Sequence, residues 1–358
     1  MASNDSSYNG PDSADFEALM RRINTTYKVG FSFSLPVTVI GLLANALVLY
    51  VILRDKKMMR AVYNVYVINL FVASFILLFV WGGFTTVAYG LYAFHDFSIY
   101  MDIAIQKGIF GSQTAILTIN SLTITVLAID RYFVIADPAG RLAWRTIKNA
   151  RIVCGVIWAV GILAGVVTLP IDMTRGLAAS FKLSTTALVL AYLVPLLVIA
   201  VSIGLTLRAA AAHRRLQDSS VSHQNITLKL RFLTVVGSFS LSFMICWGYW
   251  HAYYMATWIM IQNGRYYHFD VIVHMALYIL SNILIFVNAT LNPVLYVLTR
   301  GYLRRRVWSL LRCSSTSSTS EVANEADMLS TDVSSMMKTE IPILPVKAAG
   351  EIGVLEDY

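Results

Sequence analysis

The stretch "TVLAIDRYFVIADP" (residues 125–138) places an acidic and a basic residue directly after a long apolar run. Asp130, Arg131 and Tyr132 all have groups that hydrocarbon solvates poorly, so their position needs a reason. The run before them, about residues 106–135, exceeds the roughly 20 residues with which a helix crosses a hydrocarbon core. The stretch therefore predicts a membrane-spanning helix that carries a charged pair at one end.

Six further apolar runs of similar length occur along the 358 residues. Only 13% of the residues are charged, against about 25% in soluble proteins, and mean hydropathy is +0.64. Backbone groups in lipid must be satisfied within each segment, which favours helices. We therefore expect an all-α membrane protein, a seven-transmembrane helix bundle whose other spans are 29–53, 62–89, 151–170, 184–207, 232–260 and 271–299.

Lysine and arginine gather in the segments 54–60, 131–151, 208–231 and 300–312, while the intervening segments on the other side hold few. Basic segments face the cytoplasm in most membrane proteins. The pattern predicts a multi-pass plasma-membrane protein with its amino terminus outside and its carboxyl terminus inside. The net charge of +8 lies mostly in these segments, which favours anionic lipid over nucleic acid as the partner.

The polar residues 1–27 are expected to form an extracellular tail before the bundle, which covers residues 28–300. Asn4 and Asn24 each begin an Asn-x-Ser/Thr acceptor, so both are candidate glycosylation sites. The start shows no charged-then-apolar signal peptide, and the first span is expected to direct insertion itself.

Residues 301–313 predict a short amphipathic cytoplasmic helix, with leucine and valine on one face and arginines on the other. Cys313 at its end is a candidate palmitoylation site, and a free cytosolic thiol is the alternative. Residues 314–358 are rich in serine, threonine and acidic residues, so we expect a disordered cytoplasmic tail. This tail is either a linker or a phosphorylated segment that receptor kinases and arrestin bind.

Several residues that are weak signals singly occur in order, about one per span: Asn45, Asn69, Asp130-Arg131-Tyr132, Pro138, Trp158, Pro195, Cys246-Trp247 and "NPVLY" at 292–296. On these residues the chain resembles a divergent rhodopsin-like (class A) G-protein-coupled receptor over about residues 28–313. The resemblance implies a receptor, not an enzyme, that binds an extracellular ligand and activates heterotrimeric G proteins.

The resemblance also gives roles to the opening stretch. A buried arginine needs a partner, and Asp130 supplies one to Arg131 at rest. On activation, as the family implies, Arg131 turns toward the carboxyl-terminal helix of the G protein, while Tyr132 faces the rim. An ordinary charge pair at a helix end is the alternative.

The segment "NATLNPVLY" and Trp247 complete the expected activation switch. Pro293 removes one helical hydrogen bond and bends the seventh span. Asn292 is expected to bond either the freed carbonyls or polar groups of the second span. In the family, Tyr296 swings inward on activation and Trp247 lies at the floor of the ligand cavity.

A ligand site is expected at the outer side of the bundle, lined by Phe84, Gln113, Thr114, His251, Tyr254, Tyr278 and Asn282. Amine receptors carry an aspartate where this chain has Gln113, so a monoamine is disfavoured. A retinal Schiff base needs a lysine where the chain has Phe286, so a retinal sensor is disfavoured. A peptide or a neutral small molecule is favoured, and no cofactor or metal is expected.

Some family positions are altered in this chain. Ser74 replaces the aspartate that binds sodium, Gln106 replaces a disulfide cysteine, and Tyr249 replaces a proline of the sixth span. Ile203 replaces a tyrosine, and Lys229 stands where some relatives place an acid facing the arginine. The chain is then either a working receptor with a loosened resting state or an atypical receptor that is non-coupling or arrestin-biased.

The rival class is a membrane transporter or channel, which usually carries paired charges near the membrane midplane. The spans hold almost no such charge, and no inverted repeat is evident. A membrane enzyme is a weaker rival, because no zinc-binding His-Glu-x-x-His pattern occurs.

Overall fold

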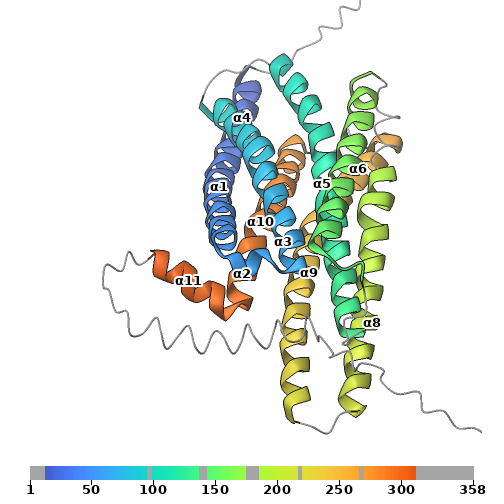
Figure 1. Cartoon of the computed structure of the whole chain (residues 1–358). Coiled ribbons are helices and arrows are strands. Elements are labelled where there is room, and N and C mark those ends of the chain that lie inside the picture. Colours follow the sequence, from blue (N-terminus) through green and yellow to red (C-terminus); the bar gives the residue numbers. More distant parts are fainter. Residues whose placement is uncertain are drawn as a thin grey trace, which may run out of the picture.

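Seven long apolar helical segments lie side by side in the computed structural model (Figure 1). The structure describes residues 13–94, 99–136, 143–174, 185–216, 220–265 and 270–311. Each segment is long and apolar enough to cross a membrane, which confirms the predicted bundle. The spans are α1 (Ser13–Arg54), α3, η1 and α4 (Val62–Leu77, Leu78–Gly82, Gly83–Phe94), α5 (Ile99–Ala136), α6 (Ile147–Thr174), η2 and α8 (Leu188–Leu193, Val194–Leu216), α9 (Ser220–Gln262) and α10 (Val271–Thr299).

The first span begins earlier than the hydropathy pattern indicates. Helix α1 starts at Ser13, so the later part of the predicted tail is helical and Asn24 lies within the helix. Tertiary contact stabilises this polar extension, because the Tyr27 ring stacks on that of Tyr92 in α4 at 4.7 Å between centroids. Asn4 lies outside the described residues.

The short helix α2 (Lys56–Met59) joins α1 to α3, and Asp55 fixes where it begins. The Asp55 carboxylate accepts hydrogen bonds from the backbone amides of Lys57 (2.8 Å) and Met58 (3.2 Å), as an N-cap does. It also accepts hydrogen bonds from the Tyr302 hydroxyl and from Arg306 Nη1 (2.6 Å). Burial alone would raise the pKa of Asp55, but these donors and the positive charge of Arg306 lower it, so the carboxylate stays ionised.

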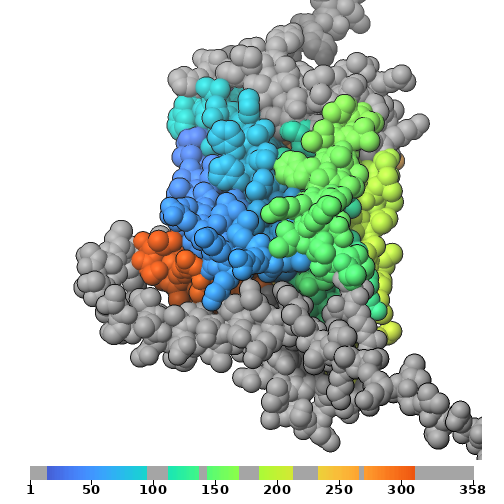
Figure 2. All heavy atoms as spheres, viewed as in Figure 1, coloured from blue at the N-terminus to red at the C-terminus, as the bar shows by residue number. Residues whose placement is uncertain are grey.

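The predicted amphipathic helix is α11 (Gly301–Leu311), which lies across the end of the bundle at α1 and α10 (Figures 1 and 2). Leu303 and Val307 are buried against the bundle, whereas Leu310 is exposed. Part of the apolar face is therefore docked on the protein. Cys313 and residues 314–358, the predicted modification site and tail, lie outside the described residues.

The outer surface of the bundle is apolar and its interior holds many polar side chains. Large apolar side chains that are more than half exposed include Phe33, Leu43, Phe79, Leu163 and Leu197. Figure 2 shows the face that α1, α3, α4 and α6 form. Such an exterior suits hydrocarbon as the solvent, so the chain is a multi-pass membrane protein.

Helix α5 lies at the centre, where it packs against α3, α6, α8 and α9. Gly161 of α6 lies directly against α5. A Cβ atom at that position would lie 2.4 Å from Ile119 Cγ1 and 2.9 Å from the carbonyl oxygen of Ala115. Because the second contact is backbone, it cannot move aside, and glycine permits the close packing.

We predict that Gly161→Ala destabilises the protein by about 1–3 kcal/mol, the usual cost of overpacking a helix interface. Gly155→Ala is the matched control on the same helix, because nothing lies within 4 Å of a Cβ atom there. Thermal unfolding in detergent can be followed with a thiol-reactive dye, since Cys154 and Cys246 are buried and unpaired. Equal unfolding midpoints for the two variants would contradict the predicted close packing.

Candidate functional site

The Asp130–Arg131 pair is buried at one end of the bundle, called here the Arg131 end. Both side chains are only 6% exposed, and Arg131 Nη2 donates a hydrogen bond to Asp130 Oδ2. Arg145, in the segment before α6, donates from Nε to Asp130 Oδ1 at 2.8 Å and from Nη2 to Oδ2 at 3.4 Å. No sequence motif singled out Arg145, whose only signal is its place in the basic segment after Pro138. Asp130 therefore has two cationic partners, which offset the cost of its burial.

Tyr132, the third residue of the opening motif, is half-buried beside Phe133.

Tyr63, at the start of α3, forms the other side of the Arg131 environment. The Arg131 guanidinium carbon lies 4.2 Å from the centre of the Tyr63 ring. Arg300, which follows α10, lies 5.4 Å from the same ring and 5.3 Å from the ring of Tyr296. All three distances are within the roughly 6 Å over which a cation–π attraction acts. Tyr63 was not among the predicted residues, because its partners come from other spans.

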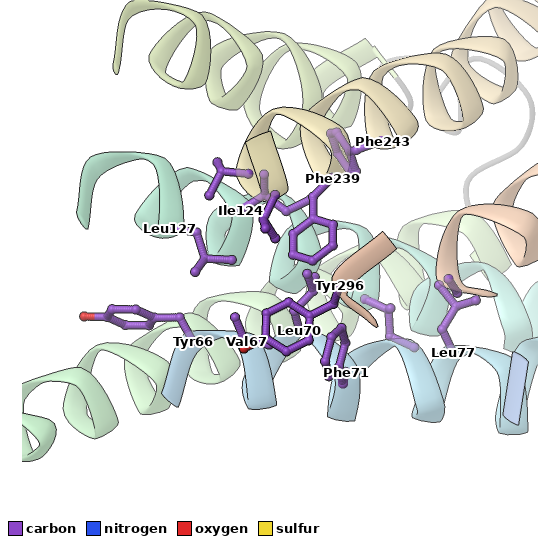
Figure 3. Close-up of a cluster of buried hydrophobic side chains, with 14 of the residues drawn as sticks. Tyr66, Val67, Leu70, Phe71, Leu77, Ile124, Leu127, Phe239, Phe243 and Tyr296 are labelled. Carbon is purple, nitrogen blue, oxygen red and sulfur yellow. The ribbon is translucent and has the colours of Figure 1, made fainter. Parts of the chain in front are cut away.

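Tyr296 is fully buried and is hydrogen-bonded to α3. Its hydroxyl donates a hydrogen bond of 2.9 Å to Asn64 Oδ1. Its ring meets Phe71 edge-on with centroids 5.5 Å apart. Figure 3 shows it among Leu70 and Phe71 of α3 and Phe239 of α9.

The hydrogen bond lost at Pro293 is replaced from α1. Proline has no N–H for the carbonyl of Ala289, four residues earlier, and Asn45 Nδ2 donates to that oxygen at 3.1 Å. Asn292 instead donates to Ser74 Oγ of α3 at 3.1 Å. Of the two bonding modes that the sequence left open for Asn292, the structure has the second.

Trp247 lies fully buried at the centre of the bundle, where it links α9 to α10. Its indole Nε1 donates to Asn288 Oδ1 at 3.3 Å, and Asn288 Nδ2 donates to Ser242 Oγ at 2.9 Å. The ring lies 6.2 Å from those of Trp81 and Phe243. Trp81 was not among the predicted residues, because its contacts depend on the register of the second span.

A tyrosine from η2 contacts the sixth span where the family proline is missing. The Tyr192 hydroxyl donates a 2.6 Å hydrogen bond to the carbonyl of Met244. A Cβ atom on Gly248 would lie 2.5 Å from that hydroxyl, so glycine permits the approach. Gly248 thus lies at a contact between η2 and α9 that the sequence did not predict.

The predicted ligand residues His251, Tyr254 and Tyr278 belong to an aromatic column at the other end of the bundle, called here the His251 end. Trp250 joins the first two, with ring centroids 5.0 Å from His251 and 4.3 Å from Tyr254. Tyr253 lies 5.4 Å from Tyr254 and 6.1 Å from Tyr278, which links α9 to α10.

Three predicted residues at this end bury polar atoms that lack a hydrogen-bond partner among the described residues. They are Gln113 Nε2, His251 Nε2 and Asn282 Oδ1, on α5, α9 and α10. A buried polar group left unpaired costs about 1–3 kcal/mol, so such atoms suit a ligand that carries matching groups. Asn282 Nδ2 bonds the carbonyl of Tyr278 at 2.9 Å. Thr114 is also buried.

Phe84 does not join the other predicted ligand residues, because its side chain is 54% exposed on the outside of the second span. The π-helical segment η1 (Leu78–Gly82) explains the difference. A π-bulge adds a residue to the turn, which rotates the later residues of the helix by about 100°. Thr85 and Thr86 are buried in place of Phe84.

A family model described as "7 transmembrane receptor (rhodopsin family)" matches residues 44–296. The matched range includes Asn45, Asn292 and Tyr296, whose hydrogen bonds join different spans. The chain belongs to this family. Rhodopsin-family receptors are not enzymes, and membership of the family excludes the transporter and enzyme alternatives.

Bradykinin receptors are among the relatives of this rhodopsin-family receptor. The chain is 25% identical over 323 residues to the B1 bradykinin receptors of Chlorocebus pygerythrus and Macaca mulatta, which covers 85% of this chain and 86% of each relative. It is 24% identical over 322 residues to that of Homo sapiens, covering 85% of both chains. The likeness extends over nearly the whole receptor.

The neutral side chain of Ser74 leads to a prediction about sodium. Ser74 is fully buried and accepts a hydrogen bond from Asn292, so the receptor has a hydroxyl where the family carboxylate holds sodium. A bare cation in a low-dielectric interior needs a charged partner. We predict that replacing sodium chloride with a large organic cation chloride leaves the thermal stability of the receptor unchanged.

Ser74→Asp is the matched control for that measurement. Its carboxylate is expected to make stability rise with sodium concentration, as a ligand that binds only the folded state requires. Sodium-dependent stabilisation of the unmodified receptor at millimolar concentration would refute the prediction.

Proposed function

We propose that this rhodopsin-family protein lies in the plasma membrane with its His251 end outside, binds an extracellular ligand there, and activates heterotrimeric G proteins through Arg131. The observation that carries the proposal is the burial of Arg131 beside Asp130 at the end of a span. A charge is held in such a place at considerable cost, which favours a functional role over packing. The opposite end supplies buried polar atoms of Gln113, His251 and Asn282 that have no hydrogen-bond partner among the residues the structure describes, and such atoms suit a ligand.

A peptide is the ligand class that we favour, with a neutral small molecule second. The chain has neutral glutamine at 113, where amine receptors have an acid. The aromatic column around Trp250 gives apolar area, and the buried amide and imidazole groups give hydrogen bonds, a combination typical of binding sites. The likeness to B1 bradykinin receptors agrees with a peptide, and bradykinin is the first peptide to test.

We predict that Arg131→Ala abolishes nucleotide exchange by G proteins while surface expression stays near normal. The measurement is exchange without added ligand, with a panel of G-protein α subunits. The variant removes the one side chain that the proposal places against the G protein. Arg151→Ala is the matched control, because Arg151 is an exposed arginine at the Arg131 end of α6. Exchange that persists in Arg131→Ala would show that Arg131 lacks the proposed role.

A second candidate function is an atypical receptor that is non-coupling or arrestin-biased. Tyr249 and Ile203 favour it, because both replace family residues of the activation machinery. Under this alternative, neither the unmodified receptor nor any variant stimulates exchange with any α subunit, but arrestin and receptor kinases still act on the serine- and threonine-rich residues 314–358. Arrestin recruitment in cells tests this alternative directly.

We also predict that Gln113→Ala and Tyr254→Ala each weaken binding of an activating ligand by about tenfold, which corresponds to about 1.4 kcal/mol. Gln113→Ala removes a buried hydrogen-bonding group, and Tyr254→Ala removes a ring of the aromatic column. Phe84→Ala serves as the control, because its side chain points out of the bundle. Radioligand competition with peptide probes, bradykinin first, measures the affinities. A loss in Phe84→Ala alone would place the ligand site elsewhere.

A further inference from the structure

Two adjacent residues of α3 hold two residues of the activation switch. Tyr63 lies against the guanidinium of Arg131 from α5, and Asn64 accepts the hydroxyl hydrogen bond of Tyr296 from α10. Asn64 is itself held in place, because its Nδ2 donates to the carbonyl of Met58 at 2.7 Å. Movement of either switch residue toward a G protein therefore breaks a contact with the same turn of α3.

The contact between Tyr63 and Arg131 is close and shielded from water. The guanidinium carbon lies 4.2 Å from the ring centre, and both residues are buried. Cation–π attraction strengthens when water is excluded, because no solvent dipoles compete for the cation. The attraction comes from the face of the ring, so it depends on the aromatic ring and not on the hydroxyl.

Arg300 extends the same arrangement to the seventh span. Its guanidinium carbon lies 5.4 Å from the Tyr63 ring and 5.3 Å from the Tyr296 ring. The Tyr63 ring is thus shared by cations from two spans. Rotating Arg131 away from Tyr63 removes the closer of these cations, which loosens the junction of α3, α5 and α10.

We propose that Tyr63 is a positioning residue that holds Arg131 in its resting orientation, by a cation–π contact from the second span. This restraint stands in for an acid on the sixth span, where the sequence has Lys229 instead. The inference deepens the proposed function and rests on Arg131 being the coupling residue. It predicts that removing the ring frees Arg131 and shifts the ligand-free receptor toward its open form.

The test compares Tyr63→Leu, which removes the ring, with Tyr63→Phe, which restores it without the hydroxyl. Tyr50→Leu is the control for loss of a tyrosine on an exposed face of a span. Two readouts are used on each full-length variant. One is ligand-free nucleotide exchange, and the other is the emission of a polarity-sensitive fluorophore on Thr234→Cys in α9, in a Cys313→Ser background.

Tyr63→Leu is expected to raise ligand-free exchange roughly thirtyfold, the change that corresponds to a cation–π contact shielded from water. The fluorophore should report outward movement of α9 at the Arg131 end. Tyr63→Phe should rescue most of both effects. In an Arg131→Ala background Tyr63→Leu should cause no further change in emission, since the two residues act as a pair.

Three results would overturn the proposal: no change in emission for Tyr63→Leu, a change in Tyr63→Phe as large as in Tyr63→Leu, or an undiminished change in the Arg131→Ala background. If Tyr63→Leu does not reach the surface, Tyr63→Met provides a side chain without a ring for the same comparison. A change in emission without exchange by any α subunit would support the restraint and contradict the proposed coupling.

Discussion

The hydrogen bond from Asn45 to the carbonyl of Ala289 joins the first and last spans at the oxygen that Pro293 leaves without a donor. A membrane interior supplies no water to take its place, so Pro293 is tolerable within α10 only while α1 stays against it. Buried hydrogen bonds hold other spans together in the same way. Asn69 of α3 accepts a hydrogen bond from Trp158 of α6 at 2.7 Å and donates one to Thr123 of α5 at 2.8 Å. Few polar side chains thus set the mutual register of the helices.

Much of this architecture could be predicted from the sequence, because length and hydropathy alone determine which segments can span a membrane. The start of α1 could not, since Ser13 and the residues after it are largely polar and lie outside the apolar run that marks the span. Periodicity also failed at Phe84, where η1 changes the helical register. Arg145 and Tyr63 were missed for a different reason: their importance lies in pairings between distant segments, which no local pattern encodes.

The missing proline of the sixth span shows how the receptor departs from its family without losing the packing around that position. Tyr192 donates to the carbonyl of Met244, and Gly248 leaves room for the hydroxyl. The tyrosine also lies 4.9 Å from His251 and 5.7 Å from Phe243, ring centre to ring centre. Tyr192 therefore couples η2 to both the His251 ring and the backbone of α9, next to Gly248, which has no side chain to obstruct the contact.

The two arginines on Asp130 have a consequence for the chemistry of switching. A carboxylate left alone in the bundle would have to capture a proton when its partner departs, because an uncompensated buried charge is very costly. Here Arg145 is a second cationic partner, 2.8 Å from Asp130, whose contact with the carboxylate does not run through Arg131. Asp130 can then stay ionised when Arg131 moves. We therefore expect this carboxylate to contribute no pH dependence to the equilibrium between the resting and the open form of the receptor.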